Sequence, residues 1–304
     1  MKVGIIIIVI LVAVSFIIAV LLTKGSDFSG LRLPSGATKD VALIKVYGAI
    51  ATEQEFSLFG AQGASSDELV KQIEKAATDD VDAVYIEINS PGGTVVASEE
   101  IANAIKKVEK PTVAFIREVG ASGGYWVASA TDFIIADPYS ITGSIGVIGS
   151  YLEFAELLEH YNITYRPLTG GKYKDIGSPF KELTGEEQAI LQQRIDIIHQ
   201  GFISEIAENR KLPYEFVKNV STGVFYLGVQ AKEIGLVDQI GSKDDVEKYL
   251  KELLNATEIN FIEYAKAPSF FDALAGVMSQ SFFYMGKGLG QGLVETGNTG
   301  ILAQ

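Results

Sequence analysis

The chain has 304 residues, no cysteine, two histidines and a net charge of −13, and 47% of its residues are hydrophobic. An acidic chain is poorly suited to bind nucleic acid through phosphates, which require a basic face. The absence of cysteine excludes disulfides, thiolate zinc sites and a cysteine nucleophile. Two histidines far apart in sequence argue against a metal site. We therefore expect neither a metal nor a cofactor. The length indicates one large domain or two small ones, and the hydrophobic fraction is enough for a substantial core.

The first segment is strongly apolar. Val3–Thr23 carries no charge and lies between Lys2 and Lys24, and about 20 apolar residues are enough to span a bilayer as a helix. We predict a retained transmembrane anchor over residues 1–24 rather than a cleaved signal, which would need a shorter apolar run and a small-residue cleavage site. The positive-inside bias places the remainder outside the cytoplasm. Residues 25–40, rich in Gly and Ser, are expected to form a linker.

Beyond the linker, predicted strands alternate with predicted helices, which indicates an α/β fold with a largely parallel, covered sheet. Strands are expected at Val41–Val46, Val81–Ile88, Pro111–Ile116, Phe133–Ala136, Ser144–Ile148 and Thr164–Pro167. Helices are expected at Ser66–Ala77, Thr94–Glu109, Ala121–Ala130, Tyr151–His160, Thr184–Asn209 and Asp244–Leu254. Thr184, with Glu187 three residues later, has the pattern of a capping box.

The end of the chain differs in composition. Apolar side chains between Phe270 and Met285 follow helical spacing, and Gly286–Gly300 is rich in glycine. We expect residues 256–304 to be an extension with one helix that packs on the core or on a neighbouring subunit. A helix lying on the membrane surface is the alternative.

Two junctions between a strand and a helix carry unusual residues. Asn89–Thr94 contains two glycines, whose open backbone at a helix N-terminus suits an oxyanion hole, a phosphate or a plain tight turn. Val119–Trp126 places Ser122 at the start of a helix, followed by two glycines. Ser122 is either an exposed nucleophile or a helix cap.

A serine nucleophile needs a base. His160 and His199 lie on predicted helices, away from the strand ends, so we interpret both as ordinary residues. A lysine base must be neutral, which requires desolvation that lowers its pKa well below about 10.4. The Gly-rich segment 170–179 offers Lys172 and Lys174, and spacing alone does not choose between them.

Five motifs in order give the chain a family resemblance. They are Asn89–Gly93, Ala121–Trp126, Thr142–Gly146, Tyr173–Asp175 and Gln230–Asp238. Together they resemble the signal peptide peptidase A family (SppA) of bacterial and archaeal serine–lysine proteases. The resemblance covers residues 41–255 and implies a Clp protease/crotonase-like fold with repeated ββα units.

The resemblance also implies roles for individual residues. Ser122 would be the nucleophile, and Lys174 would be the general base. Ser144 would hydrogen-bond the lysine amine and orient it. Gly93 and Gly123 would supply the N–H groups of the oxyanion hole.

The function implied is that of a membrane-anchored serine endopeptidase that degrades hydrophobic peptides, such as cleaved signal peptides, through an acyl-enzyme. We expect a single-pass protein of the cell membrane with an extracytoplasmic catalytic domain and an apolar substrate groove. The resemblance further implies a homo-oligomeric ring, expected to be an octamer, and leaves open whether the lysine acts within its own chain or on a neighbour.

Two other readings compete with this one. A crotonase-like acyl-CoA enzyme would share the oxyanion loops, but it would need acid/base carboxylates near the acyl group and no lysine. A catalytically inactive membrane scaffold of the same fold would not react with a serine-directed label.

Overall fold

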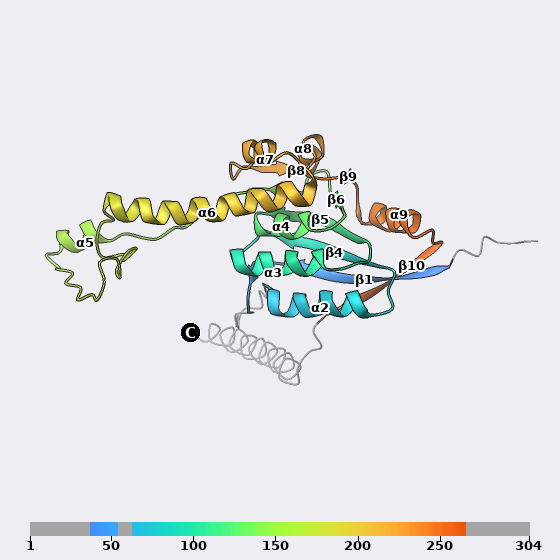
Figure 1. Cartoon of the computed structure of the whole chain (residues 1–304), viewed down its shortest axis with the longest axis horizontal. Coiled ribbons are helices and arrows are strands. Elements are labelled where there is room, and N and C mark those ends of the chain that lie inside the picture. Colours follow the sequence, from blue (N-terminus) through green and yellow to red (C-terminus); the bar gives the residue numbers. More distant parts are fainter. Residues whose placement is uncertain (1–36, 54–62, 266–304) are drawn as a thin grey trace, which may run out of the picture.

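The computed structural model describes residues 37–53 and 63–265 (Figure 1). Its main sheet has the strand order β10-β1-β4-β5-β6-β9, with β7 pairing β5 and β8 pairing β7. The strands of this sheet are β1 (Thr38–Tyr47), β4 (Ala83–Ser90), β5 (Thr112–Ala121), β6 (Phe133–Ala136), β7 (Ile141–Gly143), β8 (Phe225–Leu227), β9 (Gln239–Ile240) and β10 (Glu258–Tyr264). Every pair is parallel except β7 with β8. The predicted parallel α/β sheet is confirmed.

Helices cover both faces of the sheet. The described helices are α2 (Ser66–Thr78), α3 (Val95–Lys106), α4 (Gly123–Ser129), α5 (Ala155–His160), α6 (Gly185–Arg210), α7 (Tyr214–Val220), α8 (Gly228–Glu233) and α9 (Lys243–Leu253). A small parallel pair, β2 (Ile50–Ala51) with β3 (Ala64–Ser65), precedes α2. In Figure 1, α2, α3 and α4 lie along one side of the sheet, and α9 packs on the opposite face through Val246 and Leu250.

The alternation of side chains along β4 explains the two layers of core. Val84, Ile86 and Ile88 belong to the larger cluster, which includes apolar side chains of α2, α3, α4 and α6. Ala83 and Tyr85 belong to a second cluster, which includes two side chains of α9. Side chains of a strand point to opposite faces in turn, and each large apolar side chain contributes roughly 1.5–3 kcal/mol on burial. The core therefore fixes β4 and β5, whose carboxyl ends bear the two junctions.

Helix α6 has two different halves. Its capping box at Thr184 and Glu187 is confirmed. Near its C-terminal end Phe202 stacks on Trp126 of α4 with ring centroids 4.4 Å apart. Its N-terminal half projects away from the sheet and the helices packed on it, which we call the body, and ends beside α5 (Figure 1). We call residues 150–183 together with this half of α6 the arm.

Two predicted strands are wrong. Strand β7 ends at Gly143, before the predicted Ser144–Ile148, because Gly143 and Ser144 both have positive φ and turn the chain out of the sheet. Thr164–Pro167 lies on the arm, exposed and with no strand partner among the described residues. The predicted helix Tyr151–His160 begins later, at Ala155.

Some predictions fall outside the described residues. They are the anchor at 1–24, most of the linker at 25–40, and residues 266–304 of the extension. Within 37–53 and 63–265, no helix combines the length and the hydropathy that crossing a membrane requires. The sheet continues past residue 255, because β10 pairs in parallel with β1 from Thr38↔Glu258 to Ile44↔Tyr264.

Candidate active site

Ser122 occupies the sharp turn between β5 and α4. Its backbone has φ 52° and ψ −122°, a region that non-glycine residues avoid and that is found mainly where surrounding structure enforces it. Two hydrogen bonds hold the turn: Ser122 N–H donates to Gly143 O at 2.8 Å, and Trp126 N–H donates to Ser122 O at 3.0 Å. Its side chain makes no capping hydrogen bond, so the hydroxyl of this half-buried residue is not used as a helix cap.

The two glycine-bearing junctions touch each other. A Cβ added to Gly92 would lie 2.6 Å from Gly123 N, and one added to Gly123 would lie 3.2 Å from Gly93 N. Gly93 precedes α3, and Gly123 is the first residue of α4, so both N–H groups lie at helix N-termini. Such groups favour negative charge. The geometry is suited to hold an oxyanion beside Ser122.

Ser144 lies next to this turn, on the neighbouring strand. Ala121 of β5 pairs with Gly143 of β7, so the residues that follow, Ser122 and Ser144, leave the sheet side by side. Ser144 has φ 49°, and its hydroxyl donates to Gly223 O at 3.0 Å. Among the described residues, the other non-glycine positions with positive φ are Asn162, Lys211 and Asn255. Two of these are asparagines, which tolerate that region, and the third is a helix C-cap.

A small cavity of about 100 Å³ opens beside Ser122. Its lining is formed by Gly93, Val95, Ser98, Ser122, Gly123, Trp126, Gly146, Val147, Ile148 and Phe202. None of these residues has an ionisable side chain. The described part of the chain therefore places no carboxylate, histidine or lysine in the wall of this cavity.

Lys174 is far from Ser122 in the same chain. The segment around Lys174 is tied to the first turn of α6, since Lys172 Nζ lies 2.7 Å from Glu186 and Lys181 bridges Asp175 and Glu187. From Gly185 to Phe202, which lines the Ser122 cavity, α6 extends for roughly 26 Å. A lysine side chain has only a four-carbon stem. The structure thus brings together Ser122, Ser144, Gly93 and Gly123, and it does not bring Lys174 to them within one chain.

The other possible bases are also placed by the structure. Hydrogen bonds from Lys172 to Glu186, and contact with Tyr173, raise the pKa of Lys172, so Lys172 is held in its charged form. His160 ends α5 on the arm, where its ring contacts Tyr161 edge-on. His199 is half-buried on α6 and is absent from the cavity wall.

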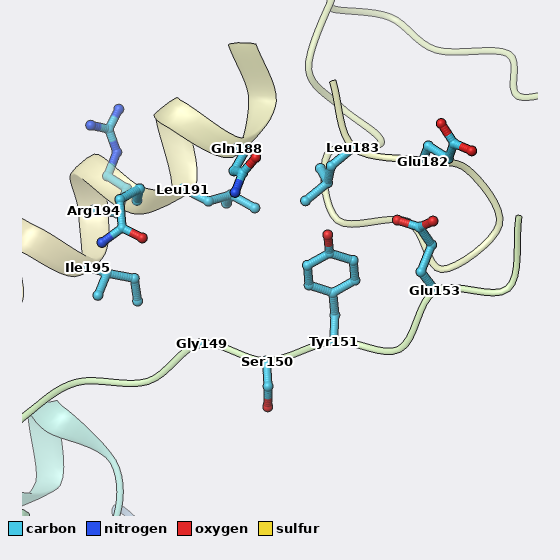
Figure 2. A pocket seen from close by; sticks show the side chains of 11 residues that line it. Gly149, Ser150, Tyr151, Glu153, Glu182, Leu183, Gln188, Leu191, Arg194 and Ile195 are labelled. Atoms are coloured by element: carbon cyan, nitrogen blue, oxygen red, sulfur yellow. The ribbon is translucent and has the colours of Figure 1, made fainter. Parts of the chain in front are cut away.

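A larger cavity of about 680 Å³ follows along the same chain segment. It lies between residues 149–153 and α6, with Glu182 and Leu183 at one end (Figure 2). Figure 2 shows the Tyr151 ring pointing into this cavity and the Ser150 side chain pointing away from it. Segment 146–153 therefore runs from the Ser122 cavity into the larger one.

Sequence reasoning missed Gly223 and Phe202. The run Ser221-Thr222-Gly223 is a turn signal in the sequence, but nothing in it indicates contact with Ser144, which lies 79 residues earlier. Phe202 has the appearance of an ordinary apolar helix residue.

Known proteins resemble this chain in sequence and in fold. The sequence model of Peptidase family S49 matches residues 104–257, and that of Clp protease matches residues 38–136. A putative protease of Methanocaldococcus jannaschii is 36% identical over 75% of this chain and 71% of its own length. A putative signal peptide peptidase SppA of Enterococcus faecium is 35% identical over 76% of this chain and 69% of its own length.

Among solved structures, a mutant of the 1510-N membrane-bound stomatin-specific protease, in complex with a substrate peptide, superimposes with a TM-score of 0.52. It is 18% identical and covers 80% of this chain and 99% of its own, so it supports the fold alone. The family match, the two relatives and the strained serine beside two glycine N–H groups agree. The chain belongs to Peptidase family S49 and is a serine protease.

Proposed function

We propose that this protein is a membrane-anchored endopeptidase that degrades hydrophobic peptides, with Ser122 as nucleophile and Lys174 as general base. The observation that carries the proposal is the conformation of Ser122. The turn is held in a costly backbone conformation that leaves the hydroxyl unused as a cap, next to two N–H groups and an apolar cavity. Strain of this kind is characteristic of active sites.

The proposed reaction is acyl transfer. Neutral Lys174 takes the Ser122 proton as the serine oxygen bonds to the peptide carbonyl carbon, and the carbonyl electron pair moves to oxygen. The N–H groups of Gly93 and Gly123 hold that oxyanion. The lysine ammonium then gives the proton to the leaving nitrogen as the C–N bond breaks. Water, activated by the same amine, releases the acyl group and restores the hydroxyl.

We place Lys174 in the site of a neighbouring copy of the chain. The distance along α6 supports this arrangement, and so does the exposure of the Lys174 side chain to solvent within one chain. A lysine must be buried to be uncharged. Contact between the arm of one copy and the body of the next would both bury the amine and deliver it.

The substrate is a hydrophobic peptide bound in extended form along segment 146–153. The small cavity beside Ser122 suits a small or aliphatic side chain next to the cleaved bond. The larger cavity, with Tyr151, Leu183, Leu191 and Ile195 in its wall, suits an apolar residue further along. The E. faecium relative is named for signal peptides, and we propose cleaved signal peptides as substrates here. The catalytic domain would reach them outside the cytoplasm, anchored through residues 1–24.

The competing functions meet specific objections. A crotonase-like acyl-CoA enzyme needs a carboxylate at the acyl group, and none lines the Ser122 cavity in the described part of the chain. An inactive scaffold gives no reason for the strained turn at Ser122 to be retained.

A serine-directed fluorophosphonate and a fluorogenic hydrophobic peptide test the proposal on the full-length protein. We expect the wild type to be labelled, Ser122→Ala to lose both labelling and hydrolysis, and Lys174→Met to lose hydrolysis by at least about 10³-fold. Lys172→Met is the matched control, and it should keep most of the activity. Full hydrolysis by Lys174→Met would exclude Lys174 as the general base. A folded wild type that is not labelled would favour the inactive membrane scaffold.

A further inference from the structure

Gly223 approaches Ser144 from a segment that the proposed mechanism has not used. Strands β7 and β8 are antiparallel, with Gly143 opposite Phe225, and the pairing continues past both strand ends. Ser144 N–H donates to Val224 O at 3.1 Å, and Gly223 N–H donates to Ile145 O at 3.1 Å. The Ser144 hydroxyl donates to Gly223 O at 3.0 Å. Ser144 is thus fixed in backbone and in side chain by one short segment.

A serine hydroxyl has a single hydrogen to donate and two lone pairs that accept. In Ser144 the hydrogen is directed at the Gly223 carbonyl, which can only accept. Any further partner of this oxygen must therefore be a donor. A lysine amine is such a partner. Without the Gly223 carbonyl, the hydroxyl could rotate and donate to the amine lone pair, which would then be occupied.

We propose that Gly223 is a positioning residue of the protease: its carbonyl directs the Ser144 hydroxyl so that Ser144 only accepts from the Lys174 amine. This inference rests on the proposed function of Ser122 and Lys174. With one N–H bound to Ser144, the amine keeps its lone pair free for the Ser122 proton. Ser144 keeps its own proton throughout, and after transfer it accepts from the resulting ammonium.

The backbone of Gly223 explains why a glycine stands there. Its φ is +82°, where side chains are disfavoured, although a Cβ would meet no atom within 4 Å. Asparagine tolerates positive φ, whereas a β-branched residue does not. Gly223→Asn should therefore keep the carbonyl in place, and Gly223→Val should move it without a direct clash.

A double-mutant cycle on the full-length protein tests the inference, with kcat and KM measured for Ser144→Ala, Gly223→Val and the combined variant. We expect each single substitution to lower kcat about tenfold or more, as loss of one hydrogen bond can do, with little change in KM. The combined variant should be no slower than Ser144→Ala, because Gly223 acts through Ser144. Gly223→Asn, unlike Gly223→Val, should keep most of the wild-type kcat.

Gly235→Val is the matched control, because Gly235 also has positive φ (+77°) but follows α8, outside the site. It should leave kcat near the wild-type value. An equal fall in kcat from Gly223→Val in the wild-type and the Ser144→Ala backgrounds would overturn the inference. A wild-type kcat for Gly223→Val would overturn it as well. If Gly223→Val fails to fold, Gly223→Ala takes its place in the cycle under the same criteria. Failure of the proposed function itself is distinguishable, since Ser122→Ala or Lys174→Met would then retain hydrolysis.

Discussion

At the scale of single residues, the proposed oxyanion hole depends on how closely the backbone of Gly93 approaches Ile50. A Cβ on Gly93 would lie 1.8 Å from Ile50 O, so Gly93→Ala must displace the loop that carries the N–H. We expect kcat to fall by about 10²–10³-fold, the usual effect of losing one oxyanion donor. Gly170→Ala is the control, because a Cβ there meets nothing within 4 Å. Peptide hydrolysis measures both variants, and wild-type kcat for Gly93→Ala would exclude its N–H from the site.

The individual residues of the site differ in how well the sequence predicts their positions. Ser122, Gly123 and Gly93 stand at the carboxyl ends of parallel strands, which meet at one edge of a sheet, so their proximity follows from local patterns. Ser144 joins them through the pairing of β7 with β5. The contact with Gly223 depends on a return of the chain 79 residues later, and no local pattern encodes it. The distance of Lys174 from Ser122 likewise depends on how α6 leaves the body.

At the scale of elements, the N-terminal cap of α6 holds in place the segment of the arm that carries Lys174. Thr184 accepts from Glu187 N–H at 3.2 Å, and Glu187 in turn pairs with Lys181 at 2.6 Å. Thr184→Ala should cost about 1 kcal/mol of local helix stability. We expect faster hydrogen exchange in the first turn of α6 and a lower rate of hydrolysis, with exchange in β4 and β5 unchanged. Thr184→Ser, which keeps the cap, should behave as wild type, and unchanged exchange in Thr184→Ala would refute the role of the cap.

Elements with strong local signals were predicted well, and the failures have physical causes. The capping box located the start of α6 correctly, and the small buried helix after Ser122 is present as α4. Strand β7 lies earlier than predicted because apolar content does not reveal the positive φ of Gly143 and Ser144. The predicted strand Thr164–Pro167 has no sheet edge to pair with, since it belongs to the arm and not to the body.

At the scale of the whole molecule, the arm bears large apolar side chains that the rest of the described chain leaves exposed. Leu152 is 72% exposed, Tyr161 is 66% exposed and Leu168 is fully exposed. Large exposed apolar side chains on one projecting segment make that segment a candidate interaction site. An arm that contacts the body of the next copy makes a head-to-tail contact, which closes into a ring when the rotation permits. The exposed arm and the remote Lys174 therefore support the same arrangement.

This arrangement predicts complementation between two inactive variants. In a mixed assembly, the Ser122 of a Lys174→Met subunit can receive the lysine of a Ser122→Ala neighbour. Co-expression at equal amounts should restore about a quarter of the wild-type rate if subunits mix randomly. Replacing the Lys174→Met partner with the Ser122→Ala/Lys174→Met double variant should restore nothing, because no nucleophile remains. If co-assembled single variants stay inactive while each folds and oligomerises, Lys174 cannot act across subunits, and a rearrangement of the arm within one chain would be required.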